Sequence, residues 1–251
     1  MTNKMLMNSV ISVVETPYYK LSFILMVILS FYGGYISMNM TYLNGFLTVL
    51  TNKLFFTWGV LIPFLIITLC TYIFFHKSDF LILRFNNKKE YLKNMLLTIF
   101  FVNLFSYVVL IVLLIICLNI FPKKGGFGFV YNPNLNCHNF IYLVFILFRL
   151  FCIIQLISII NALLCKLTNI KFTIMLNMIL YASLILLVYF TMVPISSVLS
   201  MPLYIGNYLI ISMYSSFGLE LLCTIIYFSI LLVIIYFLYY INNKRIGDIK
   251  V

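Results

Sequence analysis

The chain consists of long apolar runs separated by short polar connections. A helix that crosses a bilayer needs about 20 residues, at roughly 1.5 Å rise each. The runs of sufficient length give six predicted spans: Leu21–Met40, Leu54–Phe75, Met95–Phe121, Phe140–Cys165, Phe172–Val193 and Leu219–Ile241. The third and fourth are longer than a bilayer requires, which predicts tilt or extension beyond the lipid. The pattern predicts an all-α membrane protein with one transmembrane domain over residues 1–251.

The residues before Pro17 carry a second helical pattern. Lys4, Asn8, Ser12 and Glu15 recur every three or four positions, and mostly apolar residues fill the other face. This spacing predicts a short amphipathic helix that lies in the cytoplasmic membrane interface. A frayed terminus is the alternative.

The most charged stretch of the chain lies between the second and third predicted spans. Asn87 is followed three residues later by Glu90, a variant of the capping box that marks a helix start. This predicts a short cytoplasmic helix at about Asn86–Leu92. The side chains that it would display are Lys88, Lys89, Glu90 and Tyr91. A plain basic anchor loop is the alternative.

The segment between the fifth and sixth predicted spans contains no Asp, Glu, Lys, Arg or His, although an exposed loop of this length is normally polar. Its helix-breaking residues include Pro194, Pro202 and Gly206. Backbone at membrane depth must be helical or buried in protein. We therefore expect a re-entrant hairpin at about 194–217 that dips into the outer leaflet. A short seventh span at Leu203–Phe217 is the competing interpretation, and it would put the C-terminus outside.

Composition supports a lipid environment. Of the 251 residues, 65% are hydrophobic and 8% are charged, and the mean hydropathy is +1.16. A soluble domain carries about 25% charged residues, so the apolar residues must face lipid. A soluble catalyst, a nucleic-acid binder and a disordered regulator are excluded.

The net charge of +11 follows the loops, because cationic residues collect on the cytoplasmic side. One set of segments holds Lys4, Lys20, Lys77, Arg84, Lys88, Lys89, Lys93, Lys166, Lys171, Lys244, Arg245 and Lys250. The opposite set holds Lys53, Lys123 and Lys124. The asymmetry predicts that both termini are cytoplasmic. Heavy use of Ile, Phe, Tyr, Asn and Lys is typical of AT-rich bacterial genomes, which points to a bacterial cytoplasmic membrane.

Few polar groups lie inside the predicted spans, where they are costly and often functional. Arg149, Gln155 and Asn161 follow one another at six-residue steps in the fourth span. Each step turns a helix by about 240°, so the three side chains point to different faces. Glu220, at the start of the sixth span, is the acid at comparable depth, and an Arg149–Glu220 pair is our hypothesis.

Motifs for catalysis or metal binding are not found. His76 and His138 fall on opposite sides of the predicted bundle, and no HExxH, GxSxG or Walker sequence occurs. We therefore expect no catalytic residues, no metal site and no cofactor in this chain. A Cys117–Cys137 disulfide is the weaker interpretation of two cysteines that otherwise behave as small apolar residues.

The layout resembles the permease subunit of type-2 ABC exporters over the whole chain, by architecture and without a short diagnostic motif. The resemblance implies that Asn86–Leu92 is the coupling helix, which docks on a separate ATP-binding-cassette subunit. Its contacts would be Lys88, Lys89, Glu90 and Tyr91. It also implies that the hairpin at 194–217 is the outer gate. ATP and Mg would bind to the partner subunit.

Chains of this length and composition resemble the branch that serves lantibiotic immunity or the export of bacteriocins and toxin peptides. The resemblance implies a second permease copy or a sister permease, surrounding membrane lipid, an amphipathic peptide or similar hydrophobic cargo, and no nucleic acid. The chain departs from the family in lacking a Lys-rich N-terminal helix. The alternatives are a six-span substrate-binding or scaffold membrane protein and, less favoured, an intramembrane enzyme.

Overall fold

A computed structural model describes residues 3–52, 55–77, 88–128, 131–132, 137–190 and 217–247. Some side chains inside these ranges are not described, including those of Lys88, Lys89, Glu220 and residues 181–190. The described elements are α1 (Asn3–Val14), α2 (Pro17–Ile36), α3 (Tyr42–Thr51), the π-helix η1 (Phe55–Leu61), α4 (Ile62–Lys77), α6 (Lys88–Ile120), β1 (Tyr131–Asn132), β2 (Cys137–His138), α7 (Asn139–Leu167), α8 (Ile170–Phe190) and α11 (Phe217–Gly247).

Five helical stretches in the described part are long and apolar enough to cross a membrane. They are Pro17–Ile36, Trp58–His76, Glu90–Ile120, Phe140–Leu167 and Thr224–Lys244. Their outer faces expose large apolar side chains such as Phe105, Val112 and Ile230, which lipid accommodates and water does not. The prediction of an all-α membrane protein is therefore confirmed at the level of its class.

The fifth predicted span, Phe172–Val193, corresponds to α8 (Ile170–Phe190). The part of α8 with described side chains, Ile170–Leu180, is apolar but shorter than a span, and residues 191–193 lie outside the described ones. The predicted re-entrant hairpin also lies outside the described residues, and with it Pro194, Pro202 and Gly206. The fifth predicted span, and with it the total of six, stays a prediction, as does the hairpin.

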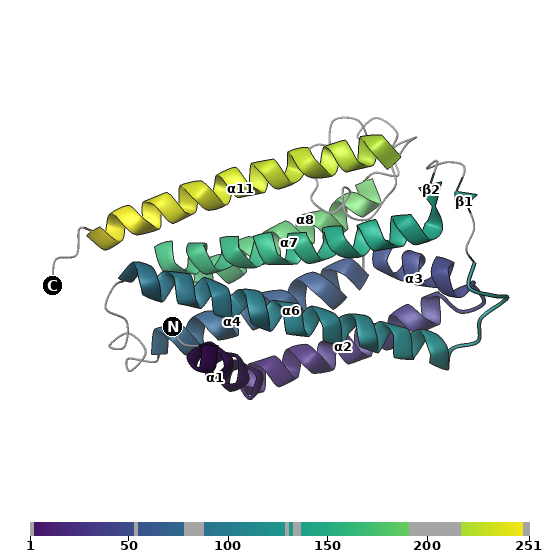
Figure 1. Cartoon of the computed structure of the whole chain (residues 1–251), viewed down its shortest axis with the longest axis horizontal. Coiled ribbons are helices and arrows are strands. Elements are labelled where there is room, and N and C mark those ends of the chain that lie inside the picture. Colours follow the sequence, from purple (N-terminus) through teal and green to yellow (C-terminus); the bar gives the residue numbers. More distant parts are fainter. Residues whose placement is uncertain are drawn as a thin grey trace.

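Helix α4 forms the centre of the bundle, packed against α2, α6 and α7. In the most apolar 18 residues of Trp58–His76, which joins the end of η1 to α4, 72% of the residues are buried, against 17% in the corresponding stretch of α11. Helix α11 packs along α7 at the edge of the bundle (Figure 1). The core therefore lies among α2, α4, α6 and α7, and α11 presents most of its surface outward.

Helix α1 lies across the long axis of the other helices (Figure 1). Val13 is fully buried toward the bundle, while Met7 and Ile11 stay 66% and 48% exposed. Thr16 Oγ1 and Cys70 Sγ, 2.9 Å apart, join the end of α1 to α4. The predicted N-terminal helix is confirmed, and a crosswise helix with outward apolar residues suits a membrane interface.

The first span occupies Pro17–Ile36 and not Leu21–Met40 as predicted. Thr16 caps its start by accepting a hydrogen bond from the Tyr19 N–H (3.3 Å), and Pro17 fits the first helical position. At its other end Ser37 Oγ donates to Gly34 O (2.9 Å). Hydropathy marks the apolar run, whereas capping side chains set where the helix begins and ends.

Two features separate the first and second spans. Helix α3 occupies a segment that hydropathy leaves as a connection, and it buries Leu43, Phe46, Val49 and Leu50 at helical spacing. The second span was predicted as Leu54–Phe75 but contains two helical forms, η1 followed by α4 through Lys77. Pro63 explains the change, because it has no N–H and its ring crowds the carbonyl four residues earlier, which the wider π-helical turns before it accommodate.

Helix α6 is continuous from Lys88 to Ile120. Lys88–Leu92 form its first turns and not a separate short helix at Asn86–Leu92, because no Gly or Pro interrupts the run after Lys88. Asn86 and the predicted capping residue Asn87 lie outside the described residues. The third span thus begins earlier than the predicted Met95, and α7 likewise extends slightly beyond Phe140–Cys165.

The connection after α6 is anchored to the end of α2. Lys123 Nζ donates to the Ser37 carbonyl (2.9 Å) and to Ser37 Oγ (2.7 Å), and the Asn39 N–H donates to Pro122 O (3.0 Å). Partial burial lowers the pKa of Lys123 from its ordinary value. These hydrogen bonds fix the described part of this connection against the end of α2.

Candidate functional site

Basic residues mark one end of the bundle. Lys77 ends α4, Lys88 begins α6, and further lysines lie in the last turn of α7, the first turn of α8 and near the end of α11, all at this end (Figure 1). Lys123 and Lys124 follow the far end of α6. The fold therefore places Lys123 and Lys124 at the opposite end of the bundle from Lys77 and Lys88. The remaining basic residue of their predicted set, Lys53, lies outside the described residues.

Tyr91 is held at the basic end between three helices. Its ring meets Phe75 of α4 edge to face, with centroids 5.8 Å apart, and Lys166 Nζ of α7 lies 5.7 Å from its centroid. The next residue, Leu92, is fully buried. Such aromatic and cation–π contacts contribute about 0.5–1.5 kcal/mol each. Tyr91 therefore packs into the bundle, whereas the sequence analysis expected it to be displayed.

A second contact joins α4 and α7 beside Tyr91. The Tyr72 hydroxyl donates to the Cys165 carbonyl (3.2 Å), and the Tyr72 ring stacks on His76 with centroids 5.8 Å apart. With the Tyr91 contacts, this ties the ends of α4, α6 and α7 together.

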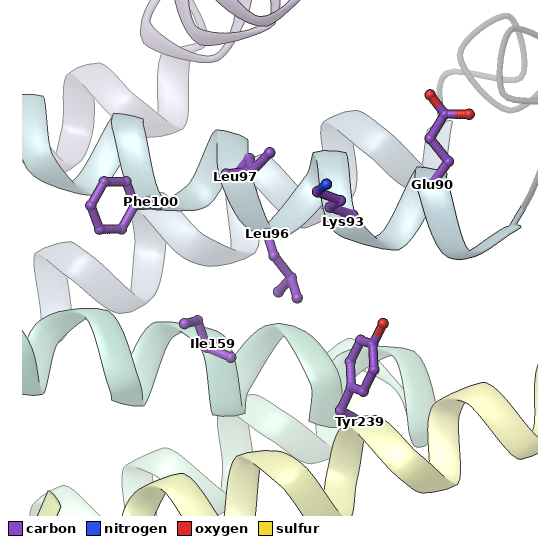
Figure 2. A pocket seen from close by; sticks show the side chains of 7 residues that line it. All are labelled: Glu90, Lys93, Leu96, Leu97, Phe100, Ile159 and Tyr239. Carbon is purple, nitrogen blue, oxygen red and sulfur yellow. The ribbon is translucent and has the colours of Figure 1, made fainter. Parts of the chain in front are cut away.

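A groove runs along the first turns of α6, beside α7 and α11. It has a volume of about 520 Å³ and is lined by Glu90, Lys93, Leu96, Leu97, Phe100, Ile159 and Tyr239. Figure 2 shows Leu96 of α6 and Tyr239 of α11 pointing into the space between these helices. The surface of the groove is mostly apolar, although Glu90, Lys93 and Tyr239 are among the residues that line it.

This groove is not among the sites predicted from the sequence. A spacing of three or four residues puts side chains on one helix face, and four of the lining residues follow it: Glu90, Lys93, Leu97 and Phe100. That these residues share one face of α6 was therefore predictable from the sequence. The contribution of Tyr239 was not predictable, because the sequence alone does not place α11 beside α6. Of the predicted contacts, Glu90 lies in the groove, while the side chains of Lys88 and Lys89 are not described.

The polar residues of α7 point to three different faces, as the six-residue spacing predicts. Gln155 Nε2 donates to the Phe100 carbonyl of α6 (3.3 Å), and Asn161 Oδ1 accepts from Asn177 Nδ2 of α8 (2.9 Å). Arg149 is 1% exposed, and its guanidinium carbon lies 5.1 Å from the centroid of the Phe145 ring. All three are buried because helices surround α7 on several sides.

The Arg149–Glu220 pair stays a prediction. Glu220 belongs to α11, which packs along α7, but its side chain is outside the described ones. On the face of Arg149, the Phe145 ring meets Phe217 of α11 with centroids 5.1 Å apart. The start of α11 therefore lies against the part of α7 that carries Arg149.

The two histidines lie at opposite ends of the bundle. His76 stacks at the basic end, whereas His138 precedes α7 at the other end. No group of three or more His, Cys, Asp or Glu residues that could hold a metal ion occurs among the described residues. Cys117 and Cys137 are both free thiols, so the disulfide considered between them is not formed.

Comparisons with known protein families, with curated proteins and with solved structures find no match to this chain.

Proposed function

We propose that the chain is the membrane-spanning subunit of an ATP-driven exporter of the type-2 ABC class. A separate ATP-binding-cassette subunit hydrolyses ATP, and two permease subunits, identical or paired with a sister, form the path. The observation that carries the proposal is the basic first turn of α6, tied through Tyr91 to α4 and α7.

The charge pattern supports a docking role for this end. Lys88 and Lys89 begin α6, at the end of the bundle where the cationic residues gather. Complementary charge speeds encounter and sets the register of a partner. Lys88, Lys89 and Glu90 are the proposed contacts. Tyr91, packed inward, is the residue that transmits the partner's motion to the bundle.

The mechanism follows from this linkage. Closure of the partner's ATP-bound dimer pushes the first turn of α6, and the Tyr91 contacts carry α4 and α7 with it. Small sliding of packed helices is an established form of conformational change in proteins, and in transporters one bundle rocks against another. The proposed outer gate at Pro194, Pro202 and Gly206 opens in response. An aromatic, apolar path suits an amphipathic peptide, such as a bacteriocin, lantibiotic or toxin peptide, or a similarly hydrophobic cargo.

Co-purification tests the proposal. The tagged chain is purified from membranes of its own host in a mild detergent, and cassette ATPase in the eluate is measured by mass spectrometry and by ATP hydrolysis. We expect a cassette subunit to co-purify with the parent chain. We expect it to be absent when the chain carries both Lys88→Glu and Lys89→Glu. Glu90 is left unchanged because it also lines the groove.

Lys124→Glu is the matched control, an exposed lysine at the opposite end of the bundle. It should leave the partner bound. The proposal fails if the parent chain brings down no cassette ATPase, or if the double charge reversal retains as much ATPase as the control.

A further inference from the structure

Two buried amides at the contact between α6 and α7 are not fully hydrogen-bonded. Asn103 of α6 is fully buried, yet neither its Nδ2 nor its Oδ1 has a hydrogen-bond partner among the described residues. Gln155 of α7 is 6% exposed, and its Oε1 has no partner among them either. Nearly all buried polar groups in proteins are hydrogen-bonded, and each exception costs free energy. Three such atoms at one helix contact therefore need an explanation.

The two amides are neighbours. Gln155 Nε2 donates to the Phe100 carbonyl of α6 (3.3 Å). Asn103 follows Phe100 by three residues, which puts both on one side of the helix, and a helical side chain covers the turn before its own Cα. The Asn103 amide therefore lies over the turn of α6 that Gln155 reaches.

The contact between α6 and α7 is uneven along its length. On the side away from the basic end, the Tyr107 hydroxyl donates to the Leu147 carbonyl over 2.7 Å. The Gln155 bond, at 3.3 Å, is longer than the usual range of about 2.7–3.2 Å. Nearer the basic end, the groove opens between the two helices, with Phe100 and Ile159 in its lining (Figure 2). The helices are therefore held firmly at Tyr107 and weakly beside the groove.

Water can supply the hydrogen bonds that the packed helices do not. The unpartnered atoms are enclosed by packed side chains, so this arrangement leaves no room for water beside them. The groove reaches Phe100 and Ile159, and Asn103 and Gln155 lie one helical turn further from the basic end. Parting of α6 and α7 over that one turn would admit water to both amides. Because unsatisfied amides destabilise the closed contact, they favour the parted one.

We propose that the α6–α7 contact has a second arrangement, in which the groove extends inward by one turn and water binds Asn103 and Gln155. The Tyr107 hydrogen bond to Leu147 stays intact and acts as the pivot. Small relative movements of packed helices are sufficient for such a change. The second arrangement is a property of this chain alone and does not depend on the proposed transport function or on a partner subunit.

The unfolding temperature of the purified chain tests the unsatisfied state of Asn103. Leucine has the branched shape of asparagine without its polar atoms, so Asn103→Leu removes the cost of burying an unpartnered amide. We expect the unfolding temperature to rise by about 2–4 °C. Asn177→Leu is the matched control, and it should lower the temperature because it removes a buried hydrogen bond to Asn161. A fall with Asn103→Leu overturns the proposal, since the amide would then be satisfied in the closed contact.

Thiol labelling tests whether water reaches the contact. Ser158, one turn from Gln155 toward the groove, is 2% exposed, and it is replaced by cysteine in a chain whose six native cysteines are changed to alanine. The purified full chain in phosphatidylcholine nanodiscs is treated with 2-aminoethyl methanethiosulfonate, which attacks thiolates in water, and intact mass gives the rate of modification. We expect Ser158→Cys to react about tenfold faster than Ser22→Cys, which replaces a fully buried serine of α2.

Asn103→Leu connects the two measurements. Added to Ser158→Cys, it should slow the modification by about fivefold, because the parted contact loses an amide that water satisfies. Asn94→Leu is the matched control: it makes the same change at a buried position of α6 about 180° around the helix, and it should leave the rate unchanged. Equal rates for the two cysteine variants overturn the proposal, as does a Ser158→Cys rate that Asn103→Leu does not alter. Because no cassette subunit is present, each outcome is independent of the co-purification experiment.

Discussion

At the scale of single residues, buried amides hold the helices around α7. Gln155 reaches α6, Asn161 pairs with Asn177 of α8, and Asn242 Nδ2 of α11 donates to the Leu163 carbonyl (3.3 Å). Lipid gives apolar helix faces little reason to associate, so packing and interhelical hydrogen bonds supply the specificity. These amides are better explained as connections between helices than as the wall of a polar channel.

A double-mutant cycle on Asn161 and Asn177 measures one such connection. Their 2.9 Å hydrogen bond is buried, and the coupling energy of such pairs in membranes averages about 0.6 kcal/mol, up to about 1.7. We expect Asn161→Leu and Asn177→Leu to be less than additive by about this amount in the free energy of unfolding in detergent. Additive effects would show that the pair contributes no coupling.

At the scale of elements, close approach of helices depends on small residues. Gly33 and Gly34 of α2 are buried against α3 and α6. A Cβ on Gly34 would lie 2.6 Å from Phe121 Cδ2 and 2.8 Å from the Cys117 carbonyl oxygen. The second contact is with backbone, so the helices themselves would have to move apart. The pair of glycines therefore sets the spacing between α2 and α6.

Gly34→Ala should destabilise the protein by about 1–3 kcal/mol, the usual cost of overpacking. Thermal unfolding can be followed with a thiol-reactive dye, because Cys70, Cys117 and Cys165 are buried and become accessible on unfolding. Gly126→Ala is the matched control, since a Cβ there meets nothing within 4 Å. Equal unfolding temperatures for the two variants would contradict the close approach.

At the scale of the whole molecule, the fold has two chemically different ends. The basic end holds the start of α6 and the ends of α4, α7 and α11, with the Tyr91 contacts and the groove between them. The other end holds the anchored connection after α6 and the short β1–β2 hairpin. The positive-inside rule predicts that the basic end of the bundle faces the cytoplasm.

Labelling of intact cells with a membrane-impermeant maleimide tests this orientation. Lys171→Cys and Lys124→Cys introduce thiols at exposed positions of the two ends. We expect Lys124→Cys to react in intact cells and Lys171→Cys only after permeabilisation, with the parent chain giving the background. Labelling of both thiols from outside, or of Lys171→Cys alone, would contradict the orientation.

Much of this organisation was predictable from the order of residues. Apolar length predicted the class and six spans, five of which correspond to long apolar helices in the described part, and the period before Pro17 predicted α1, because both depend on neighbours in sequence. Helix boundaries were less well predicted. Thr16 and Ser37 shift the ends of α2, and Pro63 divides the second span, through local hydrogen bonds and sterics that hydropathy ignores.

The sequence by itself determined that this chain lies in lipid, that its charges fall into two sets, and that Arg149, Gln155 and Asn161 face different ways. Those properties follow from composition and from the fixed rotation of a helix. The tertiary structure alone decided that Tyr91 packs inward and that Tyr239 joins α6 to complete a groove. Such contacts join residues far apart in the chain, and only the packing of the helices brings them together.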